Sequence, residues 1–196
     1  MVLVEHITSE KNKQSILEKG IECRIYNDSR SIYDKKCGIF FRPFDDPKYN
    51  ALELLNLESD NYLILNSAQN ELSFQKQLNE CDLDKKTPLQ IKFGTRYIDT
   101  LIDKVKKAEE ELHKIMIVID IPESDIKIGD GNNEPYKETE SYKNYKKEDN
   151  MLYPEIFIER NIKSDEILGI LDHSTIYDMI AKCGNKEECI KEFLKR

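Results

Sequence analysis

The first twenty residues predict a strand that passes directly into a helix. Residues 2–4 are apolar and mostly β-branched, as a strand prefers. Thr8 or Ser9 is expected to cap the helix at its N-terminus, and Gly20 to end it. Ile16 and Leu17 are expected to be its buried residues. His6 and Thr8 are thus expected at a strand-to-helix boundary, where unpaired N–H groups and the helix dipole favour anions.

The rest of the chain alternates between apolar runs and amphipathic stretches. The run 115–121 is apolar without alternation and predicts a strand covered on both faces. Further strands are expected at 21–26, 38–41, 62–65, 152–158 and 162–171. Helices are expected from Pro47 after an acidic cap, over 71–83 and 95–113, over 175–182 after Ser174, and over 186–195. This mixture predicts an α+β fold.

Length and composition predict one domain over residues 1–196. The chain is 39% hydrophobic and 35% charged, and no apolar run approaches the roughly 20 residues that cross a bilayer. The N-terminus lacks the pattern of a secretory signal, so we expect a cytoplasmic protein without a membrane partner. Segment 122–150 is charged and too polar to form core, and we expect it to be a long surface loop.

The five cysteines form no C-x-x-C pair. An odd number without that spacing predicts free thiols and not a disulfide framework or a zinc site. Cys183, Cys189 and His173 have a spacing that fits no common metal site. We expect no bound metal.

The net charge of −8 counts against binding along a nucleic-acid backbone, although it leaves room for a local basic groove. The loop 122–150 interleaves tyrosines with lysines, and two interpretations are open. The cluster is either a platform that stacks on bases and holds phosphates, or a hydrated loop. Its members are Tyr136, Lys137, Tyr142, Lys143, Tyr145, Lys146 and Lys147.

Two segments resemble a known family. The spacing His6-x-Thr8-x-x-x-Asn12-x-x-x-Ile16-Leu17-x-x-Gly20 is similar to the N-terminal signature of DarT-type enzymes, which belong to the ADP-ribosyltransferase superfamily and use NAD as ADP-ribose donor. Downstream, 153–158 and 162–167 are similar to the strand that carries the catalytic glutamate of these enzymes and to the segment after it. The two matches cover about a fifth of the chain.

The resemblance implies a sheet split around an NAD cleft, with helices on its flanks. It assigns Glu155 as the catalytic carboxylate and places His6, Thr8 and Asn12 in the NAD pocket. Arg42, in a segment that fits the family loosely, would be a functional arginine that pairs with the pyrophosphate. An aromatic would pack on the nicotinamide, and Tyr49 is one candidate beside Phe40, Phe41 and Phe44, each of which is alternatively core.

The implied function is transfer of ADP-ribose from NAD to a macromolecule, with DNA considered before protein. A toxin or a phage–host conflict factor would suit such a protein, with an antitoxin or regulatory protein as partner. Two alternatives stay open: a non-catalytic interaction module on the same fold, and an enzyme resembling RNA 2′-phosphotransferases. From local sequence alone, the favoured interpretation is that His6 is a hydrogen-bonded edge histidine and Asn12 a solvated helix residue.

Overall fold

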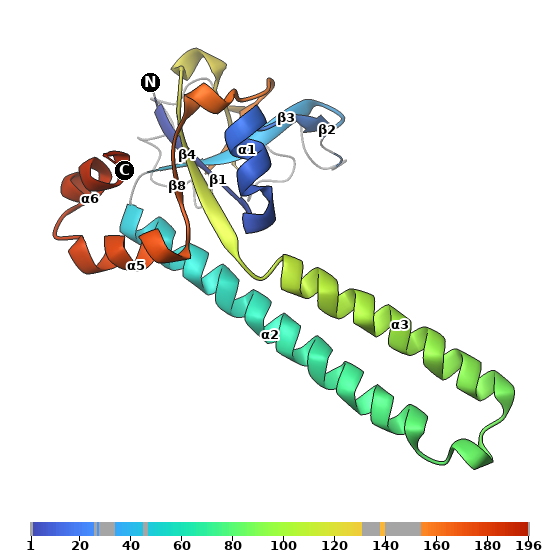
Figure 1. Ribbon diagram of the computed structural model, residues 1–196. Coiled ribbons are helices and arrows are strands. Elements are labelled where there is room, and N and C mark those ends of the chain that lie inside the picture. Colours follow the sequence, from blue (N-terminus) through green and yellow to red (C-terminus); the bar gives the residue numbers. More distant parts are fainter. Residues whose placement is uncertain are drawn as a thin grey trace.

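The computed structural model shows a sheet flanked by helices, from which a long helical hairpin projects (Figure 1). It describes residues 2–25, 27, 34–44, 47–130, 138–139 and 154–195. The strands are β1 (Val2–Ser9), β2 (Arg24–Ile25), β3 (Cys37–Pro43), β4 (Lys114–Ile121), β5 (Lys127–Asp130), β6 (Glu138–Thr139), β7 (Pro154–Ile158) and β8 (Ile167–Leu171). The α-helices are α1 (Lys13–Lys19), α2 (Pro47–Glu80), α3 (Pro88–Glu110), α5 (His173–Lys182) and α6 (Lys186–Leu194).

The strands form one antiparallel sheet in the order β6-β5-β7-β3-β1-β4-β8, with β2 added to β3. Strand β1 pairs with β4 along its whole length, from Val2 to Ser9. Its ladder with β3 is much shorter, because it joins only Val4 to Pro43 and Glu5 to Arg42. The expected α+β class is therefore confirmed, and the sheet is weakly joined between β1 and β3.

Strand β4 lies at the centre of the core and is covered on both faces, as its unalternating apolar sequence predicted. Its residues from Ile115 to Ile119 are all 0% exposed. Ile115, Ile117 and Ile119 belong to the cluster that includes Ile16 of α1. Met116 and Val118 belong to the cluster with Leu54 of α2 and with α5 and α6. Burial on two faces explains why this strand needs no polar alternation.

The expected strand 62–65 is wrong, because these residues lie in the middle of α2. A short apolar run does not distinguish a strand from a helix by period alone. In α2 the buried positions recur at helical spacing, and they are Ala51, Leu54, Glu58, Leu65 and Ala68. Tyr62, Leu63 and Ile64 are left exposed on the other sides of the helix.

The expected start of the first helix is also wrong. Strand β1 continues to Ser9, a single 3-10 turn follows at Glu10–Asn12, and α1 begins only at Lys13. Gly20 ends the helix with φ +83°, as predicted, and a Cβ there would lie 1.9 Å from the carbonyl oxygen of Ile162. Of the two residues expected to be buried, Ile16 is buried and Leu17 is 48% exposed.

Part of the expected loop 122–150 belongs to the sheet. Strand β5 pairs along β7, with Ile128 opposite Ile156 and Gly129 opposite Glu155. It also pairs with β6. A strand can be added to a sheet by backbone hydrogen bonds to its neighbour, which do not require apolar side chains. The polar sequence of this segment therefore gave little sign of β5. The interleaved tyrosines and lysines at 136–147 lie outside the described residues.

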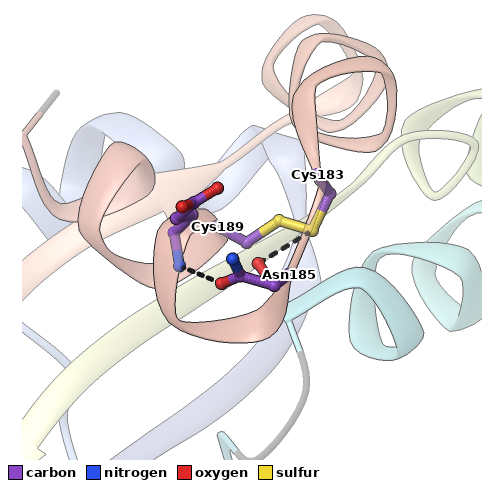
Figure 2. The surroundings of a disulfide bond; sticks show 4 residues. Cys183, Asn185 and Cys189 are labelled. Carbon is purple, nitrogen blue, oxygen red and sulfur yellow. Dashed lines mark hydrogen bonds between the residues drawn. A yellow bond between two sulfur atoms is a disulfide. The ribbon is translucent and has the colours of Figure 1, made fainter.

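The C-terminal part departs from expectation in two details. Helix α5 is capped by Asp172 and not by Ser174, because the Asp172 carboxylate accepts a hydrogen bond from the Thr175 N–H at 3.1 Å. A disulfide joins Cys183 and Cys189, whose Cα atoms are 5.2 Å apart, and links the end of α5 to α6 (Figure 2). These two cysteines were expected to be free thiols. Among the described residues, Cys23, Cys37 and Cys81 are free.

The hairpin of α2 and α3 leaves the rest of the molecule and extends into solvent (Figure 1). We call its part between Asn61 and Glu111 the arm, and the remaining described residues the body. Among the described residues, no helix is both long and apolar enough to cross a membrane.

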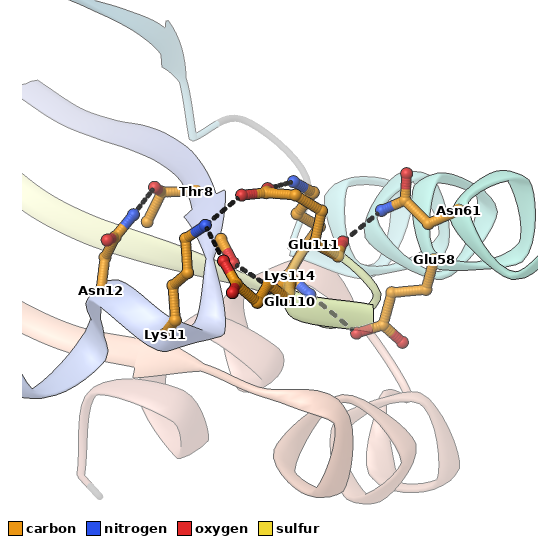
Figure 3. Close-up of polar contacts among 9 residues, drawn as sticks. Thr8, Lys11, Asn12, Glu58, Asn61, Glu110, Glu111 and Lys114 are labelled. Atoms are coloured by element: carbon orange, nitrogen blue, oxygen red, sulfur yellow. Dashed lines mark hydrogen bonds and ion pairs between the residues drawn. The ribbon is translucent and has the colours of Figure 1, made fainter. Parts of the chain in front are cut away.

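Polar contacts fasten the base of the arm to the body (Figure 3). At this base, Asn61 joins the two helices of the arm by donating a hydrogen bond to the Glu111 carbonyl oxygen at 2.8 Å. Lys11 forms an ion pair with the Glu111 carboxylate at 2.6 Å, and Lys114 forms one at 2.7 Å. These hydrogen-bonded lysines lower the pKa of the Glu111 carboxyl group, which keeps it charged at the junction.

Candidate functional site

A cavity of about 430 Å³ opens between the outer half of β1, α1, segment 21–25 and the start of β3. It lies where the short ladder between β1 and β3 has ended, so the two strands leave space for side chains there. Its volume falls in the range of roughly 300–1,000 Å³ that is typical of small-molecule sites. Its polar wall consists of His6, Thr8, Asn12, Ser15, Lys19, Glu22 and Arg24.

Three residues of the N-terminal motif meet on this wall. His6 and Thr8 share one face of β1, and Asn12 lies at the turn into α1. The Asn12 side chain does not cap the helix; its amide donates a hydrogen bond to Thr8 Oγ1 at 2.9 Å (Figure 3). Because that contact uses one N–H, the amide keeps a second N–H and its oxygen for a ligand. The strand, and not a helix N-terminus, therefore positions these groups.

His6 is held in one orientation. Its Nδ1 lies 2.9 Å from the Phe40 carbonyl oxygen, and its ring packs against Phe41 at 5.5 Å between centroids. Burial is the largest influence on this residue and lowers the pKa of its imidazole, so the ring is neutral at pH 7. Because a carbonyl oxygen only accepts, Nδ1 carries the proton and Nε2 is the acceptor.

Arg42 is not among the described residues that line the cavity. Arg42 forms ion pairs with Glu53 of α2 at 2.5 Å and with buried Glu5 at 3.7 Å. Since Glu5 alternates with His6 along β1, Arg42 lies on the face of the sheet that α2 covers. Tyr49 lies in the first turn of α2, and its side chain is outside the described part of the structure.

Glu155 lies in β7, one strand removed from β1 across β3. The register places Ile156 opposite Phe41 and Phe157 opposite Phe40. Only the backbone of Glu155 is described. Ile156 packs in the cluster that includes Ile16 and Ile21 of the cavity wall, so the strand period places Glu155, with Phe157, on the other face of β7. The Phe157 ring packs against the ring of Phe40 at 4.8 Å, and Phe40 lines the cavity.

Lys19, Glu22 and Arg24 also line the cavity, although none of them was expected there from the sequence. Arg24 reaches it because β2 pairs with the start of β3, with Arg24 opposite Gly38. The pairing of a two-residue strand with a distant one leaves almost no trace in sequence. The expected strand at 21–26 was the available signal, since a charged residue on a strand beside the N-terminal motif is a candidate for the same site.

The cavity wall supplies hydrogen-bond donors, acceptors and two cations. Among the described residues, no group of three or more metal-ligating side chains is gathered in one place. Comparisons with protein-family models, with curated proteins and with solved structures return no match to this chain.

Proposed function

We propose that this chain is an NAD-dependent mono-ADP-ribosyltransferase. The observation that carries the proposal is that His6, Thr8 and Asn12, the three polar residues of the N-terminal motif, line one cavity of ligand size. Their common side follows from the strand period and a short turn, and the structure adds that this side opens into a cavity and not into packed core. Their convergence beside a weakly joined pair of strands supports an NAD cleft of the ADP-ribosyltransferase type.

The hydrogen-bonding groups fit a nicotinamide riboside. His6 Nε2 accepts a hydrogen bond from a ribose hydroxyl, because its Nδ1–H is already donated to Phe40. Neutral histidine suits this role, since a protonated ring has no acceptor. Thr8 and Asn12 supply further donors and acceptors at neighbouring positions.

Cations for the pyrophosphate come from the cavity rim. Lys19 and Arg24 line the cavity and take the role that the family resemblance implied for Arg42. The Arg24 guanidinium offers two parallel N–H donors to phosphate oxygens. In this proposal Arg42 is a structural residue that neutralises Glu5 and Glu53.

Glu155 is the proposed catalytic carboxylate. Its strand β7 adjoins β3, and residues 38–40 of β3 line the cavity. The C1′–N bond to nicotinamide breaks, and nicotinamide leaves as a neutral base with the bonding electrons. A carboxylate stabilises the positive charge that develops on the ribose, while the acceptor atom bonds to C1′ and gives up its proton. The acceptor is a macromolecule, with DNA considered before protein.

The decisive experiment measures NAD binding and transfer separately. Wild-type protein is incubated with labelled NAD and with single-stranded DNA, RNA or cell lysate, and NAD affinity is measured by calorimetry. Glu155→Gln should abolish transfer and retain NAD binding. His6→Ala and Asn12→Ala should weaken binding about 3- to 10-fold, as expected for loss of one hydrogen bond each.

Two matched acids serve as controls. Glu159 is the acid just beyond β7; its carboxylate forms an ion pair with Lys127 at 2.7 Å, and it is not among the described residues that line the cavity. Glu159→Gln should therefore leave NAD binding and transfer unchanged. Glu22→Gln tests the carboxylate that lines the cavity among the described residues. Loss of transfer with Glu22→Gln and not with Glu155→Gln would move the catalytic role to Glu22.

Three other outcomes separate the alternatives. Wild-type protein that fails to bind NAD overturns the proposal. Binding without cleavage and without label on DNA, RNA or protein indicates a non-catalytic interaction module. Transfer of a 2′-phosphate from RNA to NAD would identify an enzyme resembling RNA 2′-phosphotransferases.

A further inference from the structure

Two of the free thiols lie on neighbouring segments of the sheet. Strand β2 pairs with the start of β3 and places Ile25 opposite Cys37. Cys23 lies just before β2, two residues from Ile25, so the strand period places it on the same face as Cys37. Its packing agrees, because Cys23 contacts the core cluster that contains Ile39, and Ile39 alternates with Cys37 along β3. The two cysteines are therefore diagonal neighbours on one face.

The two thiols interact, and water reaches them. A hydrogen bond with Cys23 is the largest influence on Cys37 and raises the pKa of its thiol. Cys37 is exposed and Cys23 is half-buried, so a dissolved oxidant has access to the pair. The remaining cysteines differ, since Cys81 is exposed in the arm and the other two already form a disulfide.

A disulfide between Cys23 and Cys37 requires a small backbone movement. Diagonal neighbours in an antiparallel pair are about 7–8 Å apart, whereas the Cα atoms of a disulfide are about 4.4–6.8 Å apart. Cys23 lies outside the two-residue strand β2, and its N–H donates to the Asn161 side-chain oxygen at 2.8 Å. A side-chain acceptor follows a shift of the backbone more easily than a ladder of strands does. Cys23 is therefore the partner that moves.

The segment that moves forms one wall of the cavity. Glu22 and Arg24, on either side of Cys23 in the chain, both line it. Burial lowers the pKa of the His6 imidazole most, and the charge of Arg24 lowers it further, so the guanidinium lies close enough to act on the opposite wall. A shift of Cys23 changes the position of Arg24 with respect to His6.

We propose that Cys23 and Cys37 are a redox-sensitive pair that a peroxide converts into a disulfide. One thiolate attacks an oxygen of hydrogen peroxide, which forms a sulfenic acid and releases the first water. The second sulfur attacks the sulfenic sulfur, the S–S bond forms and the second water leaves. The two thiols lose two electrons and two protons, and hydrogen peroxide takes up both to become two water molecules. A dithiol reductant reverses the change.

The disulfide state weakens the binding of NAD, because it holds Arg24 away from its place in the cavity wall. This effect rests on the proposed function, whereas formation of the disulfide does not.

The first test maps the oxidation products of the full chain. The protein is treated with hydrogen peroxide, the remaining thiols are alkylated, and tryptic peptides are analysed by mass spectrometry. Trypsin cleaves after Arg24 and after Lys36, so the two cysteines lie on separate peptides that a disulfide joins. The joined peptides should be the main oxidation product of Cys37, should separate in dithiothreitol and should be absent from Cys37→Ser.

Cys81 is the matched control, because it is an exposed thiol on a different part of the molecule. It should not become linked to Cys23 or Cys37. Oxidation of Cys37 to a sulfinic acid, or its linkage to Cys81 of another molecule, with Cys23 still open to alkylation, overturns the proposal. The same holds if both cysteines of the pair stay open to alkylation after Cys81 has been oxidised.

The second test compares NAD affinity before and after oxidation by calorimetry. Oxidised wild-type protein should bind NAD about 3- to 10-fold more weakly, as expected for loss of one hydrogen bond. Cys37→Ser should bind NAD equally well before and after peroxide treatment. Equal affinities in the reduced and oxidised wild type contradict the effect on the cavity. If the disulfide forms and neither state binds NAD, the proposed function fails and the thiol pair stands.

Discussion

The body and the arm are stabilised in different ways. In the body, β4 is buried on two faces by helices and strands that are distant in sequence. The arm has a single apolar seam, in which Leu65, Ala68, Leu101 and Val105 are the buried side chains among its described residues. Local contacts along one seam bury less surface for each ordered residue than a two-sided core. The two regions should therefore unfold with different free energies.

The largest effect is expected in the core of the body. Ile117→Ala removes a side chain that is 0% exposed at the centre of β4. We expect it to lower the free energy of unfolding by about 2–5 kcal/mol, measured by urea denaturation, because it leaves a cavity between packed strands. Leu63→Ala, at a 64% exposed position, should change it by less than about 0.5 kcal/mol. Equal losses would show that the centre of β4 is not packed more tightly than an exposed helix position.

A smaller effect is expected inside the arm. Leu65 is 6% exposed and packs in the seam between α2 and α3. Leu65→Ala should lower the free energy of unfolding by about 2 kcal/mol. This is the lower end of the range for such substitutions, because the two helices can move together and fill the space that the side chain leaves. Hydrogen exchange should speed up in α2 and α3 beyond Asn61 and stay unchanged in β4. Faster exchange in β4 would show that arm and body unfold together.

The next effect concerns the charged N-cap of α5, Asp172, which lies in the body. Burial alone would raise the pKa of Asp172, but hydrogen bonds from Lys13, Thr175 and Ser174 outweigh it and lower this pKa. Asp172→Ala should cost about 1–2 kcal/mol at pH 7 through loss of the cap. Asp172→Asn should cost less, because asparagine also caps helices.

The stabilising effect of the Asp172 charge depends on pH. A carboxyl group whose pKa is lower in the folded state stabilises the fold above its unfolded pKa of about 3.9, and this stability is lost as the pH falls through the folded value. The difference between wild type and Asp172→Ala should thus narrow in urea titrations below pH 4. A difference that stays constant from pH 7 to pH 3 would contradict this.

The smallest effect is expected at the tip of the arm. Thr87 and Gln90 form a capping box at the start of α3, with Gln90 N–H donating to Thr87 Oγ1 at 3.3 Å and Thr87 N–H donating to Gln90 Oε1 at 2.9 Å. Thr87→Ala should cost about 0.5–1 kcal/mol, visible as faster hydrogen exchange in the first turn of α3. Thr87→Ser keeps the hydroxyl and should behave like wild type. An effect that reaches β4 would argue against a separate arm.

The residues that line the cavity differ in how well the sequence predicts their position. His6, Thr8 and Asn12 are six residues apart at most, and their shared position follows from the period of a strand and a short turn. Lys19 and Glu22 lie close behind and were open to the same reasoning. Arg24 enters through its pairing with Gly38, and Arg42 is drawn to Glu53 on α2. These last two placements depend on contacts between distant segments.

The sequence by itself determined the local features: the buried strand at 115–121, the end of the first helix at Gly20 and the start of α2 at Pro47. Each depends on backbone preferences or burial within a few neighbouring residues. Only the tertiary structure decided that 62–65 continue a helix, that β5 joins β7 and that a hairpin projects from the sheet. In these cases the free energy comes from partners far along the chain, which a local pattern does not encode.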